Sequence, residues 1–168
     1  QSSAGGTIAA LNGGLNNLIA ATADNATSVQ WGPGTVTIGA SGQSSTDGAA
    51  NTAAIVSALG NNSGVPYAAQ VCSAYEIDSQ GNTPCESGNA CYNDWFLPAG
   101  NNLTASGQLH ALNTNRAAIG GFASALYWSS TEFFSQWGAW IQDFSAGNEG
   151  IINKPDQVRV RCVRQFTP

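Results

Sequence analysis

The sequence predicts an α+β fold, in which an N-terminal oligomerisation helix precedes a compact domain with two helices and a mainly antiparallel sheet. Three observations predict it. Apolar residues near the N-terminus recur at helical spacing, two segments in the middle of the chain begin and end like helices, and the last third alternates polar and apolar residues between turns. Helices followed by hairpins are typical of the α+β class.

The N-terminal segment has the clearest helical pattern. Four apolar residues stand three, four and three positions apart, which is the a/d spacing of a coiled coil: Ile8, Leu11, Leu15 and Leu18. The Gly13-Gly14 pair costs about 1 kcal/mol per residue relative to Ala, so this short helix is weak alone. We expect partner chains to cover it, with residues 1–30 as oligomerisation helix and linker. Packing onto its own domain is the alternative.

Residues 31–168 are expected to form the compact domain. Thr35, Val36, Thr37 and Ile38 alternate like a short strand. A helix is predicted from Asp47, a favourable N-cap residue, to just before Gly60. A second helix is predicted from about residue 104 to 113, with Leu109 and Leu112 on its buried side.

The last third of the chain is predicted to be β structure. Residues 127–131 and 139–144 alternate in the manner of strands, and residues 145–150 form a turn rich in Gly and Asn. Alternation in the final strand separates two sets of side chains. Val158, Val160 and Cys162 share one face, and Arg159 and Arg161 share the other.

The four cysteines are expected to form two disulfides. An even count in a chain without Met and with few Lys favours disulfides over thiols. Zinc is the alternative, but the usual ligand spacing is absent and His110 is the only histidine. Cys85 and Cys91 bracket a short loop, which leaves Cys72 with Cys162. In the chain-entropy model the long bridge stabilises by about 4–5 kcal/mol and the short one by about 2 kcal/mol.

Composition places the protein outside the cell, secreted or on a bacterial surface. Only 9% of residues are charged, the net charge is −5, and Asn, Ser, Thr, Gln and Gly dominate the polar residues. No apolar run approaches the roughly 20 residues that span a bilayer. We therefore expect neither membrane insertion nor nucleic-acid binding. Because the chain begins at Gln1 and contains no Met, we expect a fragment or a processed product.

The basic residues suggest a binding site for an anionic ligand. All five lie after position 115: Arg116, Lys154, Arg159, Arg161 and Arg164. Alternation places Arg159 and Arg161 on one face of a strand, about 7 Å apart. Guanidinium groups match sulfate and carboxylate oxygens. The alternative is that Arg159 or Arg161 pairs with acids of the chain such as Asp143, Glu149 or Asp156.

The aromatic residues allow a second kind of site. Trp95, Trp128, Trp137 and Trp140 could stack on sugars, although large aromatics in strands more often belong to the core. Trp137 stands between Gln136 and Gly138 in an expected turn, so it is the one we expect at the surface and include in the ligand site.

Catalysis and metal binding have little support in the sequence. His110 lies within an expected helix, and no Gly-x-Ser-x-Gly motif or other nucleophile arrangement occurs. Residues 78–82 and Asn93-Asp94 resemble calcium-binding segments, but they offer too few carboxylates. We therefore expect no enzyme, no cofactor and no metal site.

Several of these segments together resemble a known family. In chain order they are Trp95-Phe96-Leu97-Pro98, the helix with Leu109 and Leu112, Tyr127–Thr131, Ala139-Trp140, and Val160–Arg164. Over roughly residues 35–165 this set is similar to the Lcl C-terminal domain family, named for a collagen-like adhesin of Legionella. The same pattern distantly resembles C-type-lectin-like folds, an analogy that transfers no activity.

The resemblance implies a function as well as a fold. Collagen chains are trimeric, so it implies a homotrimer, with the residues of the a/d seam at the trimer interface. It also implies an adhesin head that binds sulfated glycosaminoglycans such as heparin for host attachment. The net charge of −5 opposes such binding at long range. The alternatives are a module that binds a protein or a neutral glycan, and a structural trimerisation cap for a collagen-like stalk.

Overall fold

The computed structural model describes residues 2–3, 5–10, 17–101 and 107–166. Its strands are β1 (Ser2–Ser3), β2 (Gly6–Ala10), β3 (Leu18–Ala21), β4 (Ala26–Val29), β5 (Ile77–Asp78), β6 (Cys91–Tyr92), β7 (Leu126–Glu132), β8 (Gly138–Asp143), β9 (Glu149–Asn153), β10 (Val158–Val160) and β11 (Val163–Gln165). Its helices are α1 (Gly48–Leu59), α2 (Ala68–Ser73), α3 (Gln108–Thr114) and α4 (Arg116–Ile119), with 3-10 turns at Ala40–Gly42 and Asn62–Gly64.

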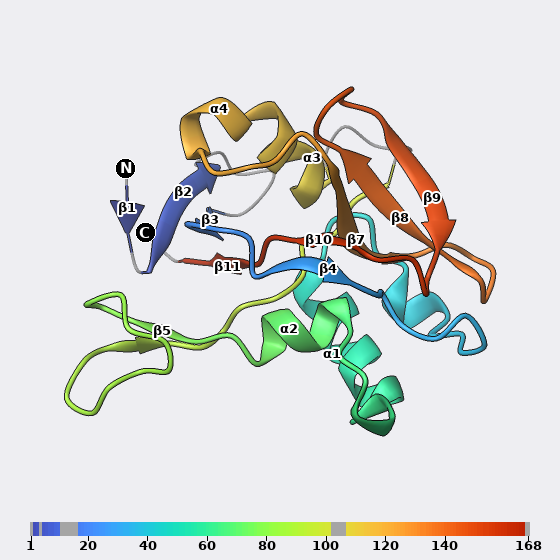
Figure 1. Cartoon of the computed structure of the whole chain (residues 1–168), viewed down its shortest axis with the longest axis horizontal. Helices are drawn as coiled ribbons and strands as arrows, with labels where there is room; N and C mark the ends of the chain where they lie inside the picture. Colours follow the sequence, from blue (N-terminus) through green and yellow to red (C-terminus); the bar gives the residue numbers. More distant parts are fainter. Residues whose placement is uncertain (1, 4, 11–16, 102–106, 167–168) are drawn as a thin grey trace.

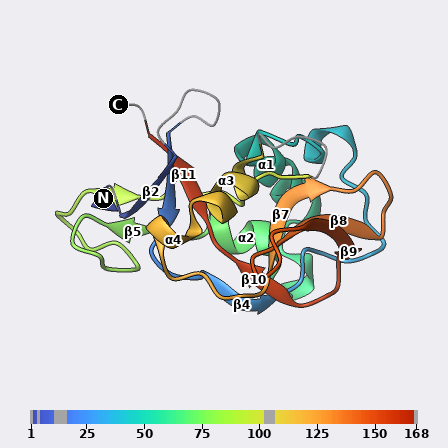
Figure 2. The ribbon, with the colours of Figure 1, turned by 90° about the horizontal axis from the view of Figure 1, so that it is seen from above.

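The described strands form two larger sheets and one small one. Five strands pair in the order β4-β10-β7-β8-β9, four in the order β1-β2-β3-β11, and β5 pairs with β6. Pairing is antiparallel throughout, except that β10 runs parallel to β7. Figure 2 shows the two larger sheets side by side, with β10 and β11 running from one to the other. The α+β class with mainly antiparallel sheets is confirmed.

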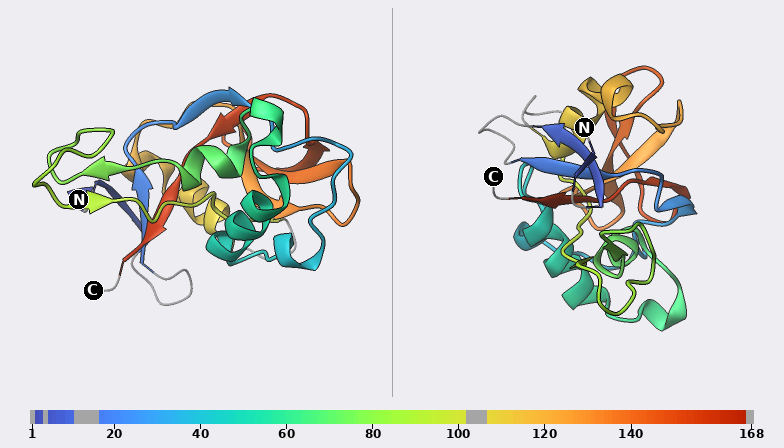
Figure 3. Two further views of the ribbon diagram at one scale, coloured as in Figure 1. Left: turned by 90° about the horizontal axis from the view of Figure 1, so that it is seen from below. Right: turned by 90° about the vertical axis from the view of Figure 1, so that its left-hand side faces the viewer.

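The helices lie on both faces of the five-stranded sheet (Figure 1). On one face, Trp128 and Ile141 pack with residues of α1 and α2. On the other face, Tyr127 and Phe144 pack with Leu109 of α3. The view from below in Figure 3 shows α1 and α2 in front of the strands.

The predicted N-terminal helix is wrong. Residues 6–10 and 18–21 are antiparallel strands β2 and β3, and β3 also pairs with β11 near the C-terminus. All four residues of β3 are buried, so the rest of the chain covers both faces of this strand. The free energy gained by this burial outweighs the weak helical preference of the segment. Ile8 is half-buried opposite Ile19, and Leu18 is fully buried, so neither offers a coiled-coil seam. Leu11 and Leu15 lie outside the described residues.

The predicted helices of the compact domain are present. Asp47 caps α1 by accepting a hydrogen bond from the Ala50 N–H at 2.9 Å, and Gly60 ends the helix with φ of 52°. Leu109 and Leu112 of α3 are buried as expected.

Other elements differ from the sequence prediction. Residues 35–38 are not a strand. The Ile38 N–H donates to the buried side chain of Glu132 in β7, and the Val36 oxygen accepts from that of Lys154, just after β9. The predicted linker contains β4, and helix α2 was not predicted.

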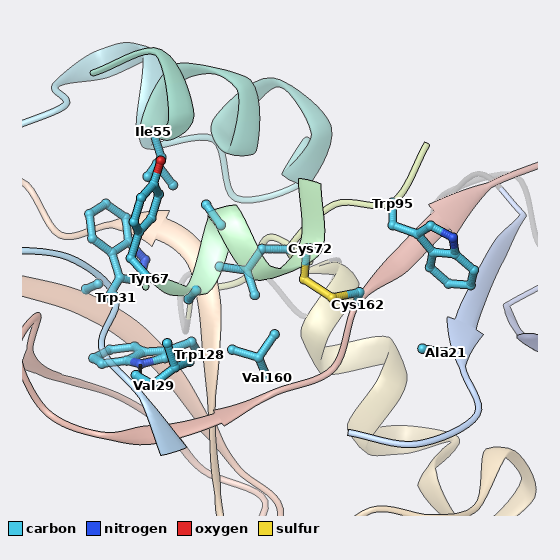
Figure 4. Packing of buried hydrophobic residues seen from close by; sticks show 14 of the residues in the cluster. Ala21, Val29, Trp31, Ile55, Tyr67, Cys72, Trp95, Trp128, Val160 and Cys162 are labelled. Carbon is cyan, nitrogen blue, oxygen red and sulfur yellow. Dashed lines mark hydrogen bonds between the residues drawn. A yellow bond between two sulfur atoms is a disulfide. The ribbon is translucent and has the colours of Figure 1, made fainter. Parts of the chain in front are cut away.

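Both predicted disulfides are present. Cys72 pairs with Cys162, and Cys85 with Cys91. The first bridge lies in the core and ties α2 to the segment between β10 and β11, beside the Trp31, Tyr67 and Trp128 group (Figure 4). A domain with two disulfides is consistent with an extracellular protein.

Candidate functional site

Asp24 binds both arginines that were expected at the centre of the ligand site. The Nη1 of Arg159 donates to Oδ2 at 2.8 Å, and the Nε of Arg161 donates to Oδ1 at 3.0 Å. Arg161 is 1% exposed and also donates to the backbone oxygen of Ala21. The Tyr127 hydroxyl lies 3.0 Å from both Asp24 oxygens. The two arginines therefore lie together, but their charges are directed at Asp24.

Lys154 forms a buried ion pair with Glu132. Its Nζ lies 2.6 Å from the Oε1 of Glu132, and neither side chain is exposed. The Nζ also donates to the backbone oxygen of Val36 at 2.6 Å and lies 4.8 Å from the centre of the Trp31 ring. Lys154 therefore cannot reach a surface ligand unless the fold opens.

The last two basic residues lie on separate elements. Arg164 donates to both carboxylate oxygens of Asp94 and lies over the Tyr92 ring. Arg116 is exposed and donates to the backbone oxygen of Asn113 at 2.8 Å. Of the five basic residues, all of which are described, only Arg116 forms no ion pair.

Pairing with acids of the chain was the alternative in the sequence analysis, and it is what the structure contains. The acids are Asp24, Glu132 and Asp94, in place of the expected Asp143, Glu149 or Asp156.

Aromatic rings gather at the turn between β7 and β8. We call them the aromatic cluster: Phe133, Phe134, Trp137 and Trp140. Phe133 lies at its centre, with its ring centroid 3.9 Å from Phe134, 5.7 Å from Trp137 and 6.0 Å from Trp140. Phe134 is 79% exposed and Trp137 is 46% exposed. Trp137 is thus the exposed tryptophan, as predicted, whereas Trp95, Trp128 and Trp140 are buried.

The backbone beneath the aromatic cluster is held by the sheet. The Phe133 N–H donates to the backbone oxygen of Gly138 at 3.1 Å, and the Lys154 N–H donates to that of Trp137 at 2.9 Å. A Cβ at position 138 would lie 2.8 Å from the Cγ2 of Ile151, so a larger residue there would have to displace that side chain of β9. The exposed rings therefore stand on fixed backbone.

A pocket of about 330 Å³ lies beside the aromatic cluster. Its volume is at the lower end of the range for small-molecule sites. Three rings of the cluster line it together with polar residues: Gln43, Asn101, Thr131, Glu132, Phe133, Phe134 and Trp140. The pocket thus combines apolar ring surface with amide and hydroxyl groups.

The carboxylate of Glu132, which lines the pocket, is balanced by Lys154 and by N–H donors of its own chain. Glu132 accepts hydrogen bonds from the Ile38 and Gly39 N–H groups, both at 2.8 Å, from the Nε2 of Gln43 at 3.2 Å, and from Lys154. Among the described residues, nothing donates to the Oε1 of Gln43. The pocket therefore offers hydrogen-bonding groups without an uncompensated charge.

Sequence reasoning missed Phe133, Phe134 and the pocket. Successive side chains of an extended segment point to opposite sides, so two adjacent Phe residues before a turn indicate that one ring faces solvent. That signal was available. The approach of Gln43 to Glu132, 89 residues away, has no signal in the sequence.

The loop that resembled a calcium site is closed by its own hydrogen bonds. Asp78 is fully buried, and its carboxylate accepts from five groups: the N–H of Gln80, Asn82 and Glu86 and the Nδ2 of Asn82 and Asn89. Burial raises the pKa of Asp78, but these bonds, led by that from Asn89, hold the pKa well below its usual value. Since both oxygens face N–H donors, Asp78 is not a calcium ligand here.

Nearby, Glu76 lies close to Cys85 and Cys91. Their sulfurs form a disulfide and are not thiolate ligands.

Asp78→Asn is expected to weaken the fold at pH 7 and to matter less as the pH falls. Because the pKa of Asp78 is lowered in the folded state, its contribution is complete above the ordinary value of 3.8 and is lost as the pH falls through the folded value. The thermal unfolding midpoints of the parent and of Asp78→Asn should be measured from pH 7 to about pH 3. The difference between the two midpoints should become smaller as the pH falls. Asp156→Asn, on an exposed turn, is the control. If the difference between the midpoints of the parent and Asp78→Asn does not change with pH, the lowered pKa of Asp78 is contradicted.

None of the described helices is long and apolar enough to cross a membrane. No family model matches the chain, and no curated protein matches it. The geometry of the aromatic cluster and its pocket is therefore the strongest guide to function.

Proposed function

We propose that this protein is an extracellular, non-catalytic binding module that holds an uncharged sugar ring of a glycan in the pocket beside the aromatic cluster. The exposure of Phe134, which lines the pocket, and of Trp137, whose ring packs against the pocket residue Phe133, carries the proposal. Large aromatic rings standing in solvent on fixed backbone are unusual in a monomer and mark binding surfaces.

The chemistry of the pocket fits a sugar. A pyranose ring has an apolar C–H face and a rim of hydroxyl groups. The ring of Phe134 provides a flat apolar surface in the pocket, the exposed ring of Trp137 provides another beside it, and the Oε1 of Gln43 provides an acceptor for a hydroxyl. A few polar groups set among apolar surface are the usual composition of a small-ligand site.

Electrostatics favour an uncharged ligand over a sulfated one. Four of the five basic residues are in ion pairs, and the net charge of the chain is −5. A polyanion would meet a repulsive field without a basic surface to hold it. Binding of sulfated glycosaminoglycans, which the family resemblance implies, stays a prediction, as do the homotrimer, the adhesin role and the distant C-type-lectin-like fold.

Replacing the exposed rings should abolish glycan binding without unfolding the domain. Truncating a central aromatic residue of a binding site typically costs about 2 kcal/mol or more, so Phe134→Ala with Trp137→Ala should lower affinity at least about thirtyfold. Because Phe134 is 79% exposed and Trp137 is 46% exposed, the unfolding midpoint should change little. Val65→Ala, at a site that is 50% exposed and remote in sequence, is the control.

A glycan array at low and high salt is the first measurement. Binding to uncharged glycans that persists at high salt and is lost in the double variant supports the proposal. Binding only to sulfated chains, collapsing as salt rises, would instead establish the polyanion function. A double variant that binds as the parent does would place the site elsewhere.

A further inference from the structure

Where α3 meets the β8–β9 hairpin, three buried oxygen atoms have no hydrogen-bond donor among the described residues. They are the Oδ1 of Asn113, the Oε1 of Gln142 and the Oε1 of Glu149. Asn113 is 5% exposed, Gln142 is fully buried, and the Glu149 side chain is 7% exposed. Buried acceptors are normally paired, so three unpaired acceptors on elements that pack together indicate a missing cationic or donating partner.

These residues meet at one place in the fold. Gln142 and Glu149 stand opposite each other in the β8–β9 pairing, so their side chains are on the same face. The Nδ2 of Asn113 lies 3.8 Å from the Cβ position of Gly147, in the turn of the same hairpin. His110, one turn before Asn113 on α3, has its Nδ1 3.7 Å from the Oε1 of Glu149.

The orientation of the Gln142 amide is determined by its partners. Its Nε2 donates to the backbone oxygens of Gly147 and Asn148, at 2.9 and 3.1 Å. A flipped amide would set oxygen against oxygen, so the Oε1 must point the other way. The Oε1 of Gln142 therefore stays without a donor in the orientation of the amide that keeps these two hydrogen bonds. It lies on the same face of the hairpin as the carboxylate of Glu149.

We propose that this contact binds one hard divalent cation, Ca²⁺, through Glu149, Gln142 and Asn113. Carboxylate and amide oxygens are the ligands that Ca²⁺ prefers, and the set contains no thiolate that would select a softer metal.

The cation would stiffen the hairpin next to the aromatic pocket. Gly100 precedes the pocket residue Asn101, and its Cβ position lies 3.9 Å from the Oε1 of Glu149. Trp140 and Gln142 lie on the same face of β8. With a single carboxylate among three side-chain ligands, affinity belongs to the weak range of extracellular calcium modules, roughly 10⁻⁴ to 10⁻³ M.

Calorimetric titration of the chelator-treated chain with CaCl₂ at pH 8 tests the site. One Ca²⁺ should bind per chain, and Glu149→Gln should weaken binding at least about tenfold, since it removes the only charged ligand. Glu86→Gln makes the same change on an exposed loop and should leave the affinity unchanged. Asn113→Asp adds a second carboxylate and should tighten binding, which tests the site even if Glu149→Gln fails to fold.

Two results would overturn the cation site. One is the absence of saturable binding, and of any rise in the unfolding midpoint, up to about 10 mM Ca²⁺, ten times the weak limit of the expected range. The other is equal affinity of the parent, Glu149→Gln and Asn113→Asp. Neither outcome bears on glycan binding by the aromatic cluster, which the array measures separately.

Discussion

Replacing Lys154 with Met is expected to destabilise the domain by about 3–5 kcal/mol, the usual cost of leaving one member of a buried ion pair without its partner. Glu132 would lose its cationic partner while its side chain has no exposure to solvent. The substitution would also weaken the loop at residues 36–39. Lys154 donates to the backbone oxygen of Val36, and Glu132 accepts from the Ile38 and Gly39 N–H groups. Urea unfolding of parent and variant measures the difference.

A double variant shows whether the pair is the cause. Lys154→Met combined with Glu132→Gln removes both charges while keeping an acceptor for the loop N–H groups. The double variant should therefore be more stable than the sum of the two single losses predicts, by about 1–3 kcal/mol. Arg116→Met removes an exposed cation that forms no ion pair with another described residue, and it should change stability by less than about 0.5 kcal/mol. Strict additivity of the two single losses would contradict a direct interaction.

The parts of the fold that were predicted correctly depend on neighbouring residues. Asp47 and Gly60 delimit α1 because an N-cap acceptor and a left-handed C-terminal residue act within one turn of the helix. The strand pattern of β7 and β8 follows from alternation, which also placed Trp137 in the turn between them. Short loop length predicted the Cys85–Cys91 bridge.

The N-terminal error shows how distant pairing overrides a local pattern. Ile8 and Leu18 fit a helical spacing, but β3 lies between β2 and β11 and is buried on both sides. A strand covered on both faces reads as a continuous apolar run, as residues 18–21 do, and such a short run cannot be told from a helix segment by periodicity. Its partner β11 lies more than a hundred residues away in the chain.

The predicted ligand site depended on exposure, which charge alone does not reveal. Arg161 and Lys154 were expected in a ligand site at the surface, but both side chains are buried, as cations rarely are. Their burial follows from Asp24 and Glu132, which lie 137 and 22 residues away in sequence. The sequence placed Arg159 and Arg161 on one continuous strand, whereas β10 ends at Val160 and Arg161 lies beyond it. Asp24 holds the two arginines together, and no local pattern identified it.

Removing the Cys72–Cys162 bridge is expected to have the largest effect of any change. Replacing both cysteines with Ala should cost about 4–5 kcal/mol, because the bridge closes a loop of 90 residues and restricts the unfolded chain accordingly. Domains of this size are stable by only about 5–15 kcal/mol, so much of the stability would be lost. Both sulfurs also lie in the core, and their removal leaves space between α2 and the segment joining the two sheets.

The second bridge is the matched control. Cys85→Ala with Cys91→Ala opens a loop of only 6 residues and should cost about 2 kcal/mol in the same model. Cys85 is half-buried and Cys91 exposed, so little packing is lost with them. Urea unfolding of the two double variants should therefore differ by at least about 2 kcal/mol. Equal losses of unfolding free energy in the two double variants would contradict the chain-entropy argument. They would mean that residual structure already restricts the unfolded chain, so that the long bridge restricts it no more than the short one does.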